Sequence, residues 1–597
     1  MAYVIDRQHC SCCHRCRVEC PVGAIRFKGT KYWIDPEKCI DCGHCAAVCH
    51  NDVISNPDLP TPRPEAHEKI VRDCDVLVIG AGASGLAAAA RAADSGKKVV
   101  VLEKNKEIGG SAWYAHMFRA QWSVWHEADG IPDPREKLYR QFMKKTGNQV
   151  DGQLVKNMLD ADVDFVNWLI TRHNLGKDYV FGDGPFNSKG LVGTYDEPYN
   201  HKRIDTSIGP GGIGWWMANK LLSIVEENGG RVLYHTAAKE LKTDEAGQII
   251  GASAQDEGGT VEITCKACVI ASGSYTRNKE LMNRFQPAFY DDGPQPTDGV
   301  HVFTHPCCTG DGITMAEAIG ADVDYYNKRS GMFGPMRHPF GTVSIAASGA
   351  SAFDVDREGN YFEERFAMGE VSPLAAVPGR YVWGIADEAS VEAACKRSMG
   401  RAPDVPGIDM DALYRNWREE LDTELSWETM YQADTLEELA EKLHIAPEKL
   451  QQAAARLEAS LNEERPPMAP PPAMDPDDKM NWSITELLEG KPGNAPGGWA
   501  PVEKKPLGHG PYYAIYKKMF HENSLGGVVI DENTNVVRGG RPVPGLYAVG
   551  DGTRGIMVPG EVGVGYIEGT ISALTFALVS GFVAGREAAA FAGGTVF

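Results

Sequence analysis

Residues 75–103 read DVLVIGAGASGLAAAARAADSGKKVVVLE, and this stretch decides the fold of the larger part of the chain. The apolar run at 75–79 predicts a buried strand, the glycines of GAGASG a tight turn, the alanine-rich run a helix, and residues 97–102 the next strand. Glu103 ends this second strand, eighteen residues beyond Gly85. Such a turn lets a pyrophosphate approach the helix N-terminus, and the acid accepts hydrogen bonds from a ribose. The unit therefore predicts a Rossmann-like dinucleotide-binding domain.

Two cysteine runs near the N-terminus share one spacing. CSCCHRCRVECPVGAI and CIDCGHCAAVCHNDVI are offset by 29 residues, and their matching cysteines are Cys10, Cys13, Cys16, Cys20, Cys39, Cys42, Cys45 and Cys49. Three cysteines in a tight loop can reach three irons of one cube, so eight suit two 4Fe-4S clusters. Zinc would need four ligands per site and does not require this interleaved pattern. Cys12 is a spare thiol in the first run, and His50 replaces a second proline, but neither change removes a ligand.

These runs resemble a bacterial two-cluster ferredoxin. The resemblance implies that the fourth ligand of each cluster comes from the other run. One cluster would then be held by Cys10, Cys13, Cys16 and Cys49, and the other by Cys39, Cys42, Cys45 and Cys20.

Length and charge set the class of protein. A chain of 597 residues predicts a small module plus a body of two or three lobes. The net charge of −21 argues against nucleic acid or an anionic membrane as a partner. The start lacks a leader pattern and cluster assembly indicates a reducing interior, so we expect a cytoplasmic protein. Residues 571–585 fall short of the ~20 residues of a membrane span and predict a buried helix.

Seven cysteines remain outside the two cluster sets. We expect most of them to be buried small hydrophobes. They are Cys12, Cys74, Cys265, Cys268, Cys307, Cys308 and Cys395.

Five segments of the body carry a family resemblance. They are GAGASG with Glu103 and the GGS turn at 109–111, ASGSYTRNKELMNRF at 271–285, TGDGITMAEAIGA at 309–321, GPYYAI at 510–515 with LGGVVID at 525–531, and PGLYAVGD at 544–551. In this order they resemble the fumarate reductase and succinate dehydrogenase flavoprotein family, which binds FAD.

The resemblance implies roles for particular residues. Gly80, Gly82 and Gly85 would hold the pyrophosphate, Glu103 the adenosine ribose, and Asp551 the ribityl or pyrophosphate side. Gly526 and Gly527 would lie against the flavin. The remaining cofactor-binding residues implied are Gly109, Gly110, Ser111, Ala271, Gly273 and Asp311. Ala112 stands where some family members carry a histidine linked to FAD, so noncovalent FAD is expected.

The family architecture also implies the domain order. The fold class expected is α/β, a Rossmann-like FAD-binding domain with an inserted α+β clamp, preceded by a small α+β ferredoxin-like domain. The ranges predicted are 1–58 for the ferredoxin domain, 59–72 for a proline-rich linker, 73–324 and 506–597 for the two parts of the FAD-binding domain, and 325–505 for the clamp.

The family pattern breaks at the substrate positions. Gly369 occupies the place of the catalytic arginine, and Glu561 that of the second substrate arginine. Glu522 and Asn523 replace the expected paired histidines. Without these arginines the charge-assisted pairs that hold two carboxylates are lost, so a dicarboxylate substrate is not expected.

Four residues are candidates for the chemistry that must accompany hydride transfer at flavin N5. Tyr513 is the first candidate for the general acid, since ketosteroid dehydrogenases of a related branch use tyrosines in this way, but it could equally pack against the isoalloxazine. The secondary candidates are His521, Arg365 and His338. The alternative for Arg365 is an ion pair with a neighbouring glutamate, and the alternative for His338, which precedes Pro339, is a place in an ordinary turn.

Two functions remain open on this sequence. The first is an enzyme in which electrons enter through two 4Fe-4S clusters, reach FAD and reduce the activated C=C bond of a small molecule such as an enone or enoate, or the reverse dehydrogenation. The second is an electron-transfer or bifurcating subunit of a larger complex. The predicted partners are a small unsaturated substrate and an external donor such as ferredoxin or another redox protein, with oligomeric state left open.

Overall fold

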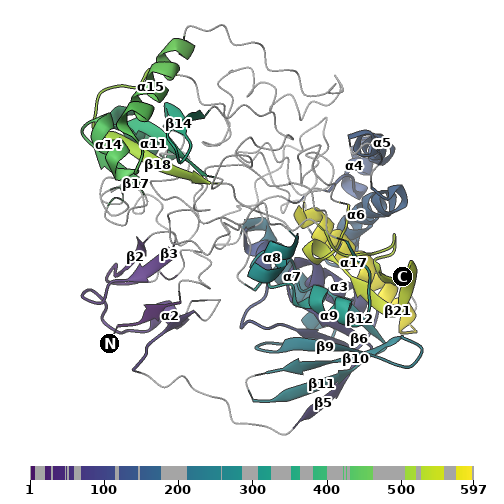
Figure 1. The fold of residues 1–597 in the computed structure, drawn as a ribbon. Helices are drawn as coiled ribbons and strands as arrows, with labels where there is room; N and C mark the ends of the chain where they lie inside the picture. The colour runs from purple at the N-terminus through teal and green to yellow at the C-terminus, as the bar shows by residue number, and fades with distance from the viewer. Residues whose placement is uncertain are drawn as a thin grey trace.

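The structure of this chain is a computed structural model. The described residues are 2–6, 16, 20–28, 31–47, 49, 53–58, 69–114, 118, 120–145, 148, 150–175, 212–256, 258–285, 307–324, 351–362, 381–399, 421, 425, 430–461, 505–518, 526–556 and 573–593. Their helices and strands form a small N-terminal group, a large α/β body and a separate five-stranded sheet with its helices (Figure 1).

The centre of the body is a six-stranded sheet whose order is β20-β21-β12-β6-β7-β8. The strands are β6 Val76–Ile79, β7 Val99–Leu102, β8 Arg231–Leu233, β12 Ala267–Ile270, β20 Asn535–Arg538 and β21 Arg541–Ala548. All neighbouring pairs are parallel except β20 with β21. The two strands predicted from residues 75–103 are confirmed as β6 and β7, and both are wholly buried because helices cover the sheet.

Helices α3 Ala83–Asp94, α7 Gly212–Glu227 and α17 Ala573–Phe591 pack together over one face of this sheet. Gly581 and Gly585 of α17 lie against the backbone of α3, where a Cβ on either would collide with the carbonyl oxygen of Ser84 or Ala88. The alanines of α3 and these glycines thus let the two helices approach more closely than larger side chains would permit.

α17 is long and apolar enough to cross a membrane by length and composition, but 72% of its most apolar window is buried inside the protein. The prediction of a buried helix from residues 571–585 is confirmed by Leu578 and Val583, which are at most 1% exposed.

A four-stranded sheet of order β5-β11-β10-β9 lies below the six-stranded one in Figure 1. Its strands are β5 Ile70–Asp73, β9 Ala237–Thr243, β10 Ile249–Gln255 and β11 Thr260–Thr264. The apolar cluster between the sheets includes Leu241, Ile263 and Cys268. Around the body lie α4 Val124–Ala128, α5 Arg135–Lys145, α6 Gly152–Arg172, α8 Lys279–Phe285, α9 Asp311–Ala318, the 3-10 turns η1 Gly110–Tyr114 and η6 Gly550–Gly552, and the pair β13 Val323–Asp324 with β19 Gly527–Val528.

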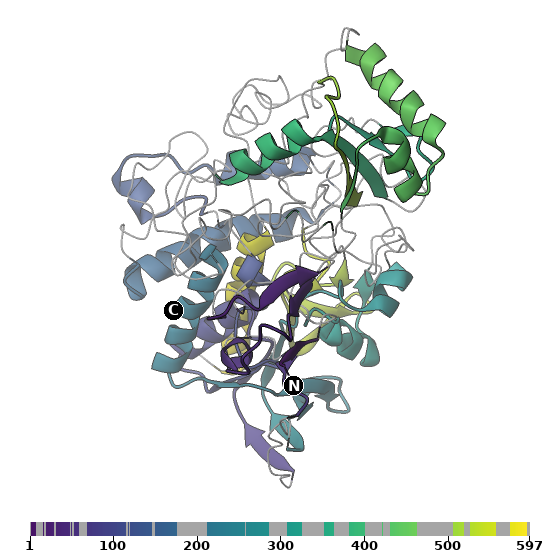
Figure 2. The same cartoon turned by 90° about the vertical axis from the view of Figure 1, so that its left-hand side faces the viewer.

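The separate sheet has the order β15-β14-β16-β18-β17, with every neighbouring pair antiparallel. Its strands are β14 Phe353–Val355, β15 Tyr361–Phe362, β16 Tyr381–Asp387, β17 Met430–Ala433 and β18 Tyr512–Lys518. In both views it lies at the opposite end of the molecule from the four-stranded sheet (Figures 1 and 2). β18 comes after residue 505, so this sheet draws on both the predicted clamp and the segment that follows it.

The two faces of the five-stranded sheet bury different clusters. Helices α14 Leu436–Lys442 and α15 Pro447–Leu461 cover one face, with Trp383 and Ala514 beneath them. Helix α11 Glu388–Met399 packs on the other face, over Tyr513 and Ile515. Neighbouring residues of β18 therefore point to opposite faces, as strand geometry requires.

The N-terminal group is small and apolar at its centre. It contains β1 Val4–Ile5, β2 Ile25–Lys28, β3 Lys31–Ile34, α2 His44–Ala47 and β4 Ile54–Ser55. β1 pairs with β4 and β2 with β3. Its core includes Tyr32, Ile54 and three of the cysteines, Cys16, Cys45 and Cys49.

Candidate functional site

Two glycine turns lie side by side at the ends of β6 and β7. Gly80 has a φ of 107°, and a Cβ on Gly85 would collide with the Gly80 carbonyl oxygen, so this turn tolerates only glycine at either place. Gly109 donates its N–H to the Ala81 carbonyl oxygen at 2.8 Å and pairs with Gly82 as an isolated bridge. The second turn, which the sequence indicated at 109–111, is thereby held against the first.

Gly82 leaves space in front of helix α3. It is the N-cap of α3 and offers no side chain to the first N–H groups of the helix. A Cβ built on Gly82 would meet only the Gly109 carbonyl oxygen, at 3.9 Å. Uncapped N–H groups at a helix N-terminus beside open space suit a phosphate.

Glu103 is held in a fixed orientation next to this turn. It is 6% exposed, and its carboxylate oxygens accept hydrogen bonds from the backbone N–H groups of Ala81 and Asn105, both at 2.9 Å. A carboxylate oxygen can accept more than one hydrogen bond, so capacity remains for the hydroxyls of a ribose.

Lys104 connects the nucleotide turn to the TGDG segment. Its Nζ donates to Thr309 Oγ1 at 2.7 Å and to Asp311 Oδ2 at 2.8 Å. Burial opposes its charge, but the Cys307 thiol and the Asp311 carboxylate outweigh burial and raise the pKa of Lys104. Asp311, which the sequence assigned to the cofactor, is thus an ion-pair partner of Lys104 beside Glu103.

Three glycine turns meet at the carboxyl ends of the strands. Gly273 follows β12, Gly552 follows β21, and Gly527 begins β19. A Cβ on Gly552 would lie 2.8 Å from the Gly273 carbonyl oxygen, and one on Gly527 would collide with the Gly552 carbonyl oxygen. Such close backbone contact forms a smooth wall without side chains, which a flat ring system could lie against.

Asp551 belongs to the same wall. Burial raises the pKa of its carboxyl to about 7, and the Cys308 thiol adds to the shift. Near neutral pH this group can therefore donate a hydrogen bond as well as accept one. Cys308 itself is 3% exposed, and its Sγ lies 3.2 Å from Ser111 Oγ.

The chemical groups that line this site match the parts of an FAD molecule. The helix N-terminus suits its phosphates, Glu103 its ribose, and the glycine wall its ring, all at the carboxyl ends of parallel strands where such ligands bind. The structure brings together several of the residues that the sequence indicated for the cofactor, with Gly82 beside Gly109 and Gly273 beside Gly552 and Gly527, while their binding of FAD stays a prediction. Sequence reasoning missed Lys104 and Cys308, although both directly adjoin predicted motifs and could have been found on that ground.

Four cysteines of one predicted cluster set, Cys20, Cys39, Cys42 and Cys45, lie among the described residues. No group of three or more histidine, cysteine, aspartate or glutamate side chains in the described part of the chain is placed to hold a metal ion, so this ligand set stays a prediction. Burial raises the pKa of Cys45 to about 11, and the nearby thiols of Cys39, Cys20 and Cys42 add to the shift. These four are the residues assigned to one cluster. Cys20 Sγ also accepts a hydrogen bond from the Ala24 N–H at 3.2 Å. Of the other set, Cys16 and Cys49 are both buried in the module core, whereas Cys10 and Cys13 lie outside the described residues.

Tyr513 lies in β18 and is 1% exposed. Its hydroxyl donates to Glu388 Oε2 at 2.7 Å, and Glu388 begins α11. The structure thus places Tyr513 in the core beneath α11 with a carboxylate partner that sequence reasoning did not find. His521, Arg365 and His338 lie outside the described residues, as do Gly369, Glu522, Asn523 and Glu561.

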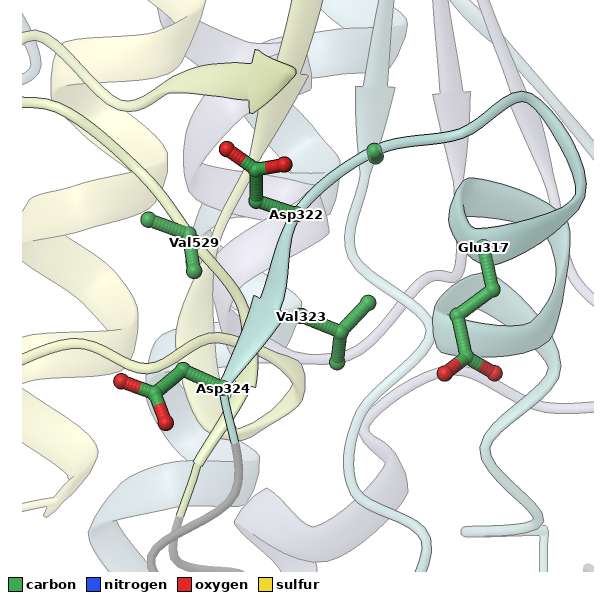
Figure 3. Close-up of a pocket in the computed structure, with 6 residues that line it drawn as sticks. Glu317, Asp322, Val323, Asp324 and Val529 are labelled. Carbon is green, nitrogen blue, oxygen red and sulfur yellow. The ribbon is translucent and has the colours of Figure 1, made fainter. Parts of the chain in front are cut away.

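A separate open hollow of about 620 Å³ lies beside β13, lined by Glu317, Ala321, Asp322, Val323, Asp324 and Val529 (Figure 3). Its carboxylates are already engaged. Glu317 pairs with Arg284, Asp324 with Arg554, and Asp322 accepts the N–H groups that follow Arg538. The hollow contains none of the residues predicted to bind the cofactor.

Comparisons with known proteins agree with this site. The profile of the FAD binding domain family matches residues 75–565, and that of the 4Fe-4S binding domain matches residues 32–55. NADH:fumarate oxidoreductase of Klebsiella pneumoniae is 26% identical over 319 residues, which are 53% of this chain and 32% of that protein. Urocanate reductase of Eggerthella lenta is 31% identical over 265 residues, 44% of this chain and 40% of that protein. The chain therefore spans well under half the length of these two relatives.

A solved structure has the same fold. The open conformation of a flavocytochrome c3 fumarate reductase matches with a TM-score of 0.59 at 22% identity, covering 87% of this chain and 79% of that one.

Proposed function

This chain belongs to the FAD binding domain family and carries a 4Fe-4S binding domain at its N-terminus, and from this premise we propose that it is an FAD-dependent iron-sulfur oxidoreductase acting on C=C bonds. The observation that carries the proposal is the site itself, in which the uncapped N-terminus of α3, the oriented Glu103 and the glycine wall meet at one edge of the sheet. FAD, when bound, supplies hydride chemistry at this edge.

The proposed substrate is an activated alkene with at most one carboxylate. The two relatives named above act, by their names, on fumarate and urocanate, which are both conjugated alkenes. In this chain Gly369 and Glu561 stand at the two arginine positions of the family. An acid there repels a dianion, so we favour an enone, an enoate ester or an aromatic-conjugated acid over fumarate.

The proton donor is proposed among the four candidates named from the sequence. Tyr513 has the chemistry, since its hydroxyl carries a proton and is held in place by a hydrogen bond to Glu388. Its full burial under α11 equally supports a role that the sequence did not indicate, that of an anchor in the clamp core. His521, Arg365 and His338 stay candidates on their sequence positions alone.

Electron entry is proposed at two 4Fe-4S clusters. Cys42 of the set Cys20, Cys39, Cys42 and Cys45 is exposed, and the apolar residues Val22 and Ile40, which lie two residues from Cys20 and Cys42 in sequence, are 40% and 59% exposed. Exposed apolar side chains around a ligand are suited to a transient protein contact. We propose this face as the docking site of an external donor such as ferredoxin, in a cytoplasmic setting.

The test is anaerobic turnover by purified protein that contains FAD and iron. Reduced viologen serves as donor, a panel of cyclic enones, cinnamate-type acids and their esters as acceptors, and fumarate as the matched dianion. We expect oxidation of viologen with an enone or monoacid and none with fumarate. Turnover of fumarate alone would refute the substrate class. No turnover of any alkene, together with fast electron exchange with a redox protein, would instead establish the electron-transfer subunit.

A further inference from the structure

A charged pair flanks the glycine wall at Gly527. Asp324 is the register partner of Gly527 in the antiparallel pair of β13 with β19, so their Cα atoms lie about 5 Å apart. On its other side Gly527 lies against the backbone of Gly552. Arg554 follows Gly552 in the chain, and its N–H donates to the Val528 carbonyl oxygen at 2.9 Å. Asp324 and Arg554 therefore belong to the two segments that adjoin Gly527.

The side chains of these two residues are paired with each other. Arg554 Nε lies 3.3 Å from Asp324 Oδ2, and the side chains are 40% and 42% exposed. Figure 3 shows Asp324 at the end of β13, on the border of the open hollow. Water screens a half-exposed pair of this kind but does not remove its field. Removal of one member leaves the charge of the other uncompensated beside the wall.

A flavin ring gains negative charge when it is reduced. Two electrons and one proton, which is added at N5, convert the oxidised ring into a reduced anion, and the electrons are those that the proposed function delivers. A nearby cation stabilises this anion, and a nearby carboxylate destabilises it. A unit charge about 8 Å away, in surroundings between protein and water in polarity, changes such an equilibrium by about fivefold.

We propose that Arg554 and Asp324 set how readily the bound flavin accepts electrons. Arg554 stabilises the negative charge of the reduced ring, and Asp324 offsets part of that stabilisation. The two positions at which the family carries arginines hold Gly369 and Glu561 in this chain, so neither of them supplies such a cation. The inference rests on the FAD site of the proposed function, but it holds for any substrate and for either direction of the reaction.

Titration of the FAD-containing protein with sulfite tests the proposal. Sulfite adds to N5 of an oxidised flavin and leaves a negative charge on the ring, so its Kd reports the same stabilisation without an electron donor or a substrate. The loss of the absorbance band of oxidised flavin follows the reaction. We expect Arg554→Met to raise the sulfite Kd about fivefold and Asp324→Asn to lower it about fivefold. The double variant should return close to the wild-type value, because it removes both charges.

A second ion pair supplies the matched controls. Arg284 and Glu317 pair at 3.2 Å between α8 and α9, and neither residue is on a segment that adjoins Gly527. Arg284→Met and Glu317→Gln make the same changes of charge and should leave the sulfite Kd within about twofold of wild type. Flavin analysis and circular dichroism verify that each variant is folded and contains FAD.

The sign of the two shifts separates an effect of charge from a structural effect. A disturbed site would weaken sulfite binding in both single variants, whereas the proposal requires shifts in opposite directions. Shifts in one direction, or none beyond those of the controls, would overturn it. The flavin midpoint potential, measured against a reference dye, should fall in Arg554→Met and rise in Asp324→Asn, and it decides the matter if sulfite does not bind. Unshifted variants that contain FAD would refute this inference alone, whereas a wild-type protein that binds no FAD would refute the proposed function.

Discussion

Glu103→Gln is expected to weaken FAD binding while leaving the fold intact. The carboxylate accepts the backbone N–H groups of Ala81 and Asn105, and it is proposed to accept ribose hydroxyls as well. An amide keeps one acceptor oxygen but turns an NH₂ group toward a donor that the second oxygen had satisfied. Hydrogen bonds to a charged group contribute about 1.5–3 kcal/mol each, so loss of one at the ribose predicts a rise in the FAD Kd of about 10- to 150-fold.

The assay is titration of the FAD-free protein with FAD, followed by quenching of flavin fluorescence. Glu240→Gln is the matched control. Glu240 is exposed on β9, so this substitution removes the same charge away from the site. Circular dichroism verifies that both variants fold. An FAD Kd for Glu103→Gln within about twofold of the control, a difference of less than 0.5 kcal/mol, would refute the ribose role.

Four further changes test other parts of the structure. Cys42→Ser should lower the iron content by about four atoms per chain while FAD is retained, as measured by iron and flavin analysis. An unchanged iron content would show that Cys42 is not a cluster ligand. Asp162→Asn should flatten the pH dependence of the free energy of unfolding. Burial raises the pKa of Asp162 to about 8, so the stability that its neutral form confers is lost as the pH rises toward that value. In denaturant titrations the wild-type unfolding free energy should fall as the pH rises from about 4 to 8 and level off above that, and this fall should be absent from the variant. Gly581→Ala should cost about 1–3 kcal/mol by forcing α17 away from α3, and a thermal midpoint equal to wild type would contradict the close contact. Tyr513→Phe removes the hydrogen bond to Glu388: loss of stability with unchanged kcat would identify an anchor, and loss of kcat in a stable protein a proton donor.

Local patterns were sufficient to predict the strand, turn, helix and strand of residues 75–103. The spacing of Gly80, Gly82 and Gly85 before an acid specifies a strand, a turn and a helix whose contacts are all close in sequence. Helix α3 and strands β6 and β7 accordingly lie where residues 75–103 indicated. The same reasoning identified the buried character of α17, because apolar composition alone distinguishes a core helix from a surface helix.

Partners that meet from distant segments were not visible in the sequence. Tyr513 and Glu388 are 125 residues apart, and their contact exists because β18 pairs with β16. The same pairing takes β18 past the boundary that the sequence indicated at 505. Strand order in a sheet depends on which edges remain unpaired once the chain has folded, and no local spacing records that.

The cysteines of this chain include some whose role follows from local spacing and some whose neighbours are set by the fold. The repeated spacing of Cys39, Cys42 and Cys45 by itself determined an iron-sulfur loop, because three ligands of one cube must come from one short turn. Cys74 carries no such signal, and only the parallel pairing of β5 with β11 brings it next to the segment that holds Cys265. Sequence spacing determines what a short loop can hold, whereas contacts between distant segments are decided by sheet pairing and core packing, which arise only in the folded chain.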